Sequence, residues 1–176
     1  MTRKALVPAG LGAAALAATV LLAAPALAAT TTGHSQFDVY FPGQKPATSY
    51  YVDNIATQKD GTIAGRSRLS WQILDDQAID LSKRFTSFKI TSRIEERLTK
   101  DGTDNVYSSK TCDLTKLVND NYTWFQDEPV NNCAAPSALY DGEVFWSSDS
   151  TIVYDIEGDG KGAITQELQG SPLIHG

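Results

Sequence analysis

The chain has 176 residues, of which 15 are basic and 21 are acidic, giving a formal net charge of −6. This acidic balance disfavours binding to nucleic acid or to anionic membrane surfaces, both of which attract basic patches. Only two histidines and two cysteines are present, which leaves little material for histidine- or thiol-dependent catalysis.

The first 29 residues have the features of a cleavable export signal. Arg3 and Lys4 precede a run of about 20 apolar residues, and the small residues Ala28 and Ala29 suit a signal peptidase. An uncleaved membrane anchor is the alternative, but alanine and glycine fill most of the run, which favours cleavage. We therefore expect residues 30–176 to form a single secreted, extracellular domain with no membrane attachment after cleavage.

Beyond a short polar start at residues 30–35, apolar and polar side chains alternate with a period of two. This pattern is typical of strands that have one buried and one wet face. In the third apolar stretch, Leu69 and Trp71 share one parity while Arg66 and Arg68 share the other. We expect strands at residues 36–41, 49–56, 62–74, 88–98, 105–112, 122–126, 143–147, 151–156 and 163–168.

The segments between these strands contain four Asp-Gly pairs, at residues 60–61, 101–102, 141–142 and 159–160. Both residue types tolerate a positive φ, so such pairs close tight hairpins. Residues 75–85 fit either an extended segment or a short helix, and residues 113–118 fit one helical turn. The pattern predicts an all-β fold, an antiparallel β-sandwich of about eight or nine short strands, with a small up-and-down barrel as the alternative.

Cys112 and Cys133 are the only cysteines of the chain. In an oxidising compartment an even number of cysteines indicates a disulfide. The bond would close a loop of about 22 residues, which is worth roughly 3 kcal/mol in the chain-entropy model. A free thiol or a metal pair is the alternative, and two cysteines without a nearby histidine make a poor zinc site.

The loop between the cysteines carries the best candidate for ligand binding. Tyr122, Trp124 and Phe125 stand there among amide and carboxylate side chains. Flat apolar rings flanked by hydrogen-bonding groups are typical of surfaces that bind sugars or proteins. The alternative is that Tyr122 and Trp124 cap the core from a strand.

Paired carboxylates would instead indicate a glycosidase-like hydrolase. Glu96 has the strand parity of Ile94, so we expect its carboxylate on the core face, with Asp155 or Glu143 as the second carboxylate. A buried carboxylate could serve as a general acid. The alternative is that Glu96 pairs with an arginine of a neighbouring strand or reaches water at a strand end.

The segment that contains Asp155, Glu157 and Asp159 resembles the start of the calcium-binding loops of EF-hand and dockerin-like proteins. The resemblance implies Ca²⁺ ligands at these three side chains. It departs from the pattern at Gln166, where a bidentate glutamate is usual, and strands are expected where helices would flank the loop. A glycine-rich hairpin turn is the alternative, and we expect no other cofactor.

The two histidines, His34 and His175, lie near the ends of the exported part, where a rigid catalytic arrangement is unusual. Residues 126–135 beside Cys133 are the one segment suited to an exposed inhibitory loop. The sequence favours a secreted, monomeric, non-enzymatic protein that binds a polysaccharide or an extracellular protein. A glycosidase-like hydrolase and a protease inhibitor are the alternatives.

Overall fold

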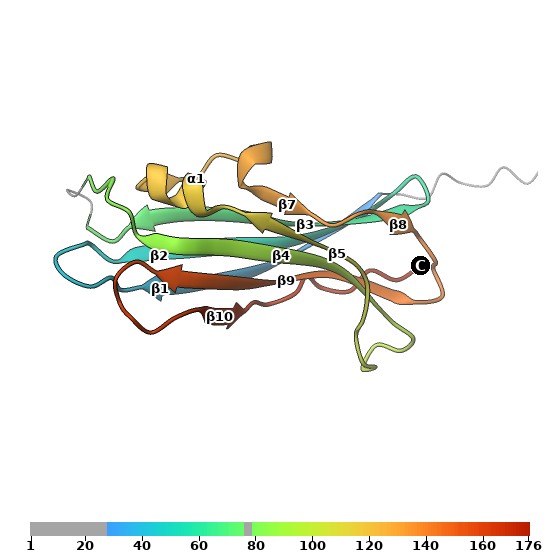
Figure 1. Cartoon of the computed structure of the whole chain (residues 1–176). Coiled ribbons are helices and arrows are strands. Elements are labelled where there is room, and N and C mark those ends of the chain that lie inside the picture. The colour runs from blue at the N-terminus through green and yellow to red at the C-terminus, as the bar shows by residue number, and fades with distance from the viewer. Residues whose placement is uncertain (1–27, 76–78) are drawn as a thin grey trace, which may run out of the picture.

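The computed structural model describes residues 28–75 and 79–176 (Figure 1). The predicted export signal, residues 1–29, lies outside the described residues except for its last two. Residues 76–78, in the segment with ambiguous periodicity, also lie outside them, and the described residues 79–84 form neither helix nor strand. Within the described part, no helix has the length and apolar character needed to cross a bilayer.

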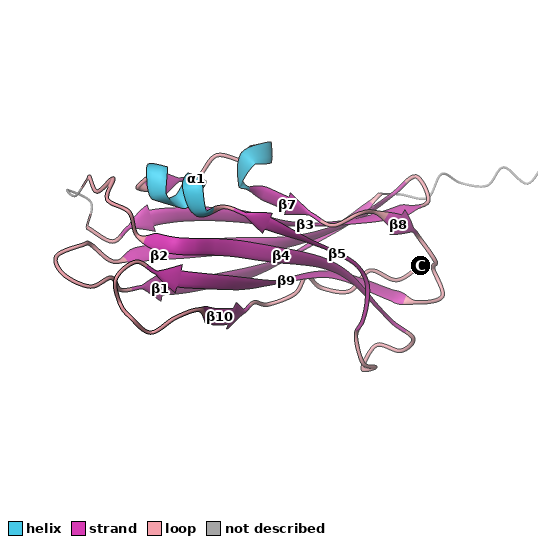
Figure 2. Cartoon of the chain, viewed as in Figure 1, coloured by secondary structure: helices cyan, strands magenta, loops and turns pink. Residues whose placement is uncertain are grey.

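Two antiparallel sheets make up the fold, and the secondary structure is almost entirely strand (Figure 2). The first, sheet A, contains β1 (Ala29–Val39), β2 (Thr48–Lys59) and β3 (Thr62–Ile73), with β6 (Thr123–Trp124), β7 (Asn132–Ala134) and β8 (Ala138–Leu139) all paired to β3. The second, sheet B, has the order β10 (Ile164–Glu167), β9 (Phe145–Ile156), β4 (Phe85–Arg97) and β5 (Asn105–Asp113). The predicted sandwich is confirmed, and the two sheets remain separate rather than closing into the alternative barrel.

Among the residues that the structure describes, helical structure is confined to the connection between β5 and β7. It consists of α1 (Thr115–Asp120) and the 3-10 helix η1 (Pro129–Asn131), and this connection lies along one side of the sandwich (Figure 1). The expected helical turn at residues 113–118 is therefore confirmed, with its start and end shifted by two residues.

The predicted alternation of buried and wet side chains is confirmed in the central strands. Trp71, Ile90 and Ile94 are fully buried, while Arg66 and Arg68 lie on the opposite face of β3. Successive side chains of a strand point to opposite faces, so a sheet with a dry side must show this pattern in its sequence.

The Asp60-Gly61 pair closes the β2–β3 hairpin in the predicted way. Lys59 pairs with Thr62 across a two-residue loop, and both loop residues have positive φ, 50° for Asp60 and 72° for Gly61. Two positive φ angles give the turn a twist that matches the twist of the strands.

Three expectations about strand limits are wrong. The polar residues 30–35 are not a loose start but the first half of β1, because they pair with β2 from Ala29↔Gln58 onward. The two strands expected at residues 143–147 and 151–156 are one continuous strand, β9, which pairs with β4 along its whole length. Leu98, the last residue of the strand expected at residues 88–98 and of the same parity as the buried Ile94, is 78% exposed because β4 ends at Arg97.

An aromatic cluster fills the larger part of the core. Tyr50 packs against Phe85 and Phe88 with ring centroids 5.8 and 5.3 Å apart, and Tyr154 lies 5.7 Å from Phe85. A second, smaller apolar cluster around Trp146 fills the other end of the sandwich. Edge-to-face and offset ring pairs of this kind stabilise a core beyond the area that they bury.

A belt of buried polar side chains separates the two clusters. The Asn54 Oδ1 accepts hydrogen bonds from the hydroxyls of Ser67 and Ser150, each at 2.7 Å, and the Ser67 and Ser92 hydroxyls lie 3.0 Å apart. These residues come from both sheets, so the belt holds one sheet in register with the other. A satisfied polar network is costly to misalign, because any slip would leave buried groups unpaired.

The segment after β10 returns along the sandwich as a strap, residues 169–176. The Gln169 N–H donates to the Ser35 hydroxyl at 2.8 Å, and the Gln169 carbonyl accepts from Asn54 Nδ2 at 2.9 Å. Further along, Ile174 forms a backbone bridge with Trp146. The strap therefore joins β1 and β2 of sheet A to β9 of sheet B.

Candidate functional site

The predicted disulfide between Cys112 and Cys133 is confirmed, and it links β5 of sheet B to β7 of sheet A. The Cα atoms of the pair lie 5.8 Å apart. The bond thus joins the two sheets along one side of the sandwich and encloses the loop that carries the predicted aromatic residues.

The disulfide loop is anchored to the core by buried polar contacts at its first half. Arg84 is fully buried and donates hydrogen bonds to the carbonyls of Val118 and Asn121, at the end of α1. Carbonyls at a helix C-terminus carry partial negative charge, which suits a guanidinium group. The Asn119 Oδ1 accepts the backbone N–H groups of Arg84 and Phe85 at 2.9 and 3.0 Å.

The second half of the loop is anchored in the same way. Asn131 is fully buried, and its Nδ2 donates to the carbonyls of Leu69 and Gln126 at 2.7 and 2.9 Å. The Trp71 indole N–H donates to the Asn121 carbonyl at 2.9 Å. These contacts fix the loop on β3, so its exposed side chains are presented from a rigid support.

The structure does not bring the three predicted ligand-binding aromatics together on one surface. Trp124 is half-buried and stacks on the buried Trp71, with centroids 6.1 Å apart and planes inclined by 16°. Tyr122 is also half-buried. Phe125 is 60% exposed, and its ring lies 6.1 Å from that of Tyr51 on the outer face of sheet A.

The Tyr51–Phe125 pair borders a row of paired charges on the same outer face. Asp53 accepts from Arg68 Nε at 3.2 Å, and its other oxygen lies 2.6 Å from His34 Nδ1. Arg68 also pairs with Asp127 at 3.1 Å, and Arg66 pairs with Asp127 at 3.3 Å. The row therefore runs from β1 across β2 and β3 to the disulfide loop.

Amide groups complete this row. Asn132 Nδ2 donates to Asp127 at 3.0 Å, and Asn132 Oδ1 accepts from Arg66 at 3.2 Å. Beside the aromatic pair, Gln72 Nε2 donates to the Tyr51 hydroxyl at 3.2 Å. We call this surface the outer A face; it comprises His34, Tyr51, Asp53, Arg66, Arg68, Gln72, Phe125, Asp127 and Asn132.

The pairings on the outer A face favour the ionised forms of Asp127 and Arg68. The hydrogen bond from Asn132, together with the charges of Arg66 and Arg68, lowers the pKa of Asp127. The hydrogen bond to Asp53 raises the pKa of Arg68. Two arginines thus face two aspartates, so the central charges of the face cancel while their hydrogen-bonding positions stay fixed.

Shallow hollows flank the outer A face on the disulfide loop. One, of about 540 Å³, is lined by Arg66, Asp127, Asn132 and neighbouring residues. Another, of about 350 Å³, is lined by residues 121 and 123–126, which include Trp124 and Phe125. The face therefore continues into concave surface at the loop, where flexible groups of a bound molecule could be enclosed.

Of the carboxylates considered for a hydrolase, Glu96 and Asp155 lie far apart on the same two strands. Glu96 is half-buried and pairs in register with Trp146, whereas Asp155 pairs with Ser87 at the other end of the same two strands. Nine residues of β9 separate these positions, which corresponds to about 30 Å. The two carboxyl groups of a glycosidase lie within about 10 Å of each other. The other suggested partner, Glu143, is exposed.

Two of the three carboxylates of the calcium-like segment, Glu157 and Asp159, have separate local partners. Glu157 pairs with Lys83 at 2.7 Å and accepts from the Thr86 hydroxyl, and these contacts lower its pKa. Asp159 accepts the backbone N–H of Lys161 at 2.9 Å. In the part of the chain that the structure describes, no three His, Cys, Asp or Glu side chains form a group that could hold a metal.

A buried ionic cluster on the outer face of sheet B was missed by the sequence analysis. Arg93 pairs with Glu95 at 2.8 Å and with Asp149 at 3.2 Å. Burial raises the pKa of both carboxyl groups, and Glu95 is only 5% exposed. Strand parity correctly places Glu95 opposite the core face, but parity carries no information about how deeply a neighbouring strand covers that side.

The segment considered as an inhibitory loop, residues 126–135, alternates between buried and exposed residues in its second part, where Ala134 is exposed. Residues 126–130 are exposed, whereas Asn131 and Cys133 are fully buried and the segment continues into β7. Of the two histidines, His34 belongs to the outer A face and His175 stacks on Phe145 with ring centroids 4.1 Å apart.

Comparison with protein-family models, with curated proteins and with solved structures found no significant match to this chain. Its function is therefore inferred from the geometry of its own residues.

Proposed function

We propose that this chain is a secreted, non-enzymatic binding protein whose outer A face holds a neutral polysaccharide. The observation that carries the proposal is the exposed Phe125 ring, which lies beside Tyr51 and next to a row of fixed hydrogen-bonding side chains. The apolar faces of sugar rings pack on aromatic rings, and their hydroxyl groups accept and donate hydrogen bonds at the ring edges.

The charge pattern favours a neutral glycan over an ionic one. Arg66 and Arg68 are matched by Asp53 and Asp127, so the face has no net charge to attract a polyanion or a polycation. Mutual pairing also holds these side chains in place before a ligand arrives, which lowers the entropy lost on binding. Export is supported by the signal-like N-terminus and by the disulfide, since disulfides persist in oxidising compartments.

The proposal is tested by retention of the purified protein on insoluble polysaccharides such as cellulose, chitin and xylan, followed by titration with soluble oligosaccharides of the retained type. Phe125→Ala should weaken binding roughly tenfold or more, as expected for a central aromatic contact. The matched control is Tyr107→Ala, because Tyr107 is a similarly exposed aromatic residue on β5 of sheet B.

Equal loss of binding in the two variants would show that the effect is not specific to the outer A face. If the wild-type protein bound no glycan but captured an extracellular protein, and this capture were lost in Phe125→Ala, the outer A face would be assigned to a protein partner instead.

A further inference from the structure

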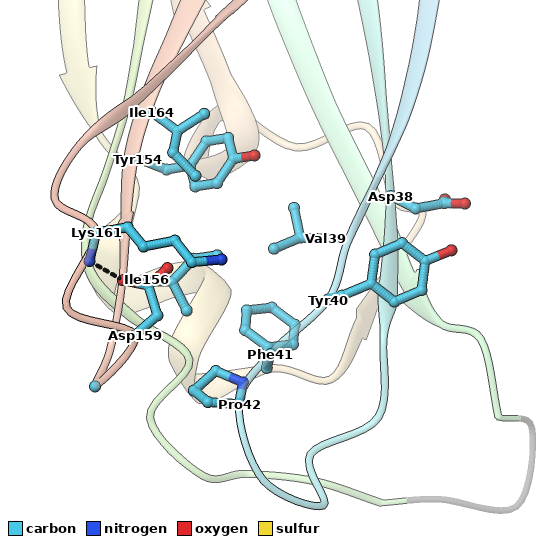
Figure 3. Close-up of a pocket in the computed structure, with 11 residues that line it drawn as sticks. Asp38, Val39, Tyr40, Phe41, Pro42, Tyr154, Ile156, Asp159, Lys161 and Ile164 are labelled. Carbon is cyan, nitrogen blue, oxygen red and sulfur yellow. Dashed lines mark hydrogen bonds between the residues drawn. The ribbon is translucent and has the colours of Figure 1, made fainter.

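A cavity of about 480 Å³ opens between the two sheets on the side opposite the disulfide (Figure 3). It lies where the end of β1, in sheet A, faces β9, β10 and the turn between them, in sheet B. The disulfide and β7 join the sheets on the other side, whereas β1 and β10 are not paired with each other. The volume falls within the range of about 300 to 1,000 Å³ that is typical of small-ligand sites.

Apolar side chains form part of the cavity wall on both sides. Val39 and Phe41 line it from the β1 side, and Ile156 and Ile164 line it from the β9–β10 side. The side chains of β1 alternate, so the buried Val39 points between the sheets, while the exposed Asp38 borders the cavity at its rim (Figure 3). The wall therefore suits an apolar chain or ring.

Two hydrogen-bond donors line the same cavity. Tyr154 is 6% exposed, burial raises the pKa of its phenol, and its hydroxyl makes no hydrogen bond with another described residue. Lys161 extends its side chain from the β9–β10 turn toward Val39 and Ile156 (Figure 3), and its ammonium group forms no ion pair among the described residues. Each group thus has an unused donor.

The carboxylates at the cavity are already engaged. Asp38 accepts a hydrogen bond from the Ser49 hydroxyl, and Asp159 accepts the backbone N–H of Lys161. Neither carboxylate pairs with the Lys161 ammonium. Lys161 is exposed and the Tyr154 hydroxyl is not enclosed, so both donors are open to water and available to an acceptor on a bound molecule.

We propose that this cavity binds a small amphipathic carboxylate, with its apolar part against Val39, Phe41 and Ile164 and its carboxylate at Lys161 and Tyr154. A charge-assisted hydrogen bond to an ammonium group is stronger than one between neutral groups. The inference goes beyond the proposed glycan site, because it concerns a different surface and a different class of ligand.

The test uses octanoate as the probe and octanamide as its uncharged counterpart, with binding followed by NMR of the methyl groups of Val39, Ile156 and Ile164. Octanoate should shift these signals saturably at millimolar concentration and bind roughly tenfold tighter than octanamide. Lys161→Met keeps the length of the side chain and should reduce octanoate affinity to that of octanamide. Lys59→Met, at an exposed lysine at the end of β2, is the matched control.

Tyr154→Phe should weaken octanoate several-fold without changing the apolar wall. The proposal is overturned if octanoate leaves the three methyl signals unchanged, if octanamide binds as tightly, or if Lys161→Met and Lys59→Met have the same effect. Glycan binding by the outer A face should persist in Lys161→Met. The failure of one proposal can therefore be distinguished from the failure of the other.

Discussion

Trp124 stacks on Trp71 with the ring planes inclined by 16°. One of the three aromatic residues predicted for ligand binding is therefore continuous with the core, whereas the adjacent Phe125 turns outward to Tyr51. Because neighbouring residues of an extended segment point to opposite sides, a single short run of aromatic residues supplies both a core contact and an exposed ring.

We expect Trp124→Ala and Phe125→Ala to separate stability from binding. Loss of the Trp124 ring removes a half-buried stack and should lower the free energy of unfolding by about 2 kcal/mol. Loss of the exposed Phe125 ring should change it by less than about 0.5 kcal/mol while weakening glycan retention. Urea unfolding of both variants, alongside the polysaccharide assay, checks this; a destabilised Phe125→Ala protein would place that ring in the core.

Reduction of the Cys112–Cys133 bond should destabilise the protein by roughly 3 kcal/mol, because the unfolded chain regains the entropy of an open loop. The double variant Cys112→Ser/Cys133→Ser, compared with the oxidised wild type by thermal and urea unfolding, measures the effect. Its glycan affinity should also fall, since the loop that carries Phe125 would lose one anchor. Unchanged stability would mean that the anchors at Asn119 and Asn131 suffice.

Gly33→Ala should loosen the C-terminal strap. A Cβ atom at this position would lie 2.1 Å from the Gly170 carbonyl oxygen, a backbone atom that cannot move without displacing the strap. We expect a loss of about 2 kcal/mol in the free energy of unfolding, together with faster amide exchange at Ile174. Gly142→Ala, whose Cβ would meet its nearest atom at 3.5 Å, is the control and should have little effect.

The buried Arg93–Glu95–Asp149 cluster should make the free energy of unfolding depend on pH. Burial raises the pKa of Glu95, so the folded protein retains this proton to a higher pH than the unfolded chain does. The contribution of Glu95 to stability therefore falls as the pH rises above the usual carboxyl range. Glu95→Gln removes this contribution, so the variant should gain stability relative to wild type between about pH 4 and about pH 7.

A variant whose stability relative to wild type should change with pH in the opposite direction provides the control for this experiment. The hydrogen bonds from Thr115 lower the pKa of Asp113, so its ionised form is favoured in the folded state. Asp113→Asn should therefore lose stability relative to wild type as the pH rises toward about pH 4, below the range of the Glu95 effect, because the ordinary aspartate pKa lies near that value. Urea unfolding of both variants at about pH 2.5, about pH 4 and about pH 7 measures these changes, and changes of the same sign in the two variants would contradict the assignment.

Several features followed from the sequence because they depend on short-range patterns. The period of two placed Trp71, Ile90 and Ile94 in the core, and the Asp60-Gly61 pair marked a hairpin turn. The cysteine count indicated the disulfide. The limits of β1 and β9 did not follow, because pairing with β2 and β4 extends both strands through polar residues with weak strand patterns.

By itself, the amino-acid sequence determined which side of each central strand is buried. Apolar and polar residues must alternate along a strand if the sheet is to bury one face and expose the other. Only the tertiary structure decided which exposed groups meet. Phe125 reaches Tyr51 from 74 positions further along the chain, and Arg93 meets Asp149 across β4 and β9. Such long-range contacts depend on strand order and register, which local periodicity does not encode.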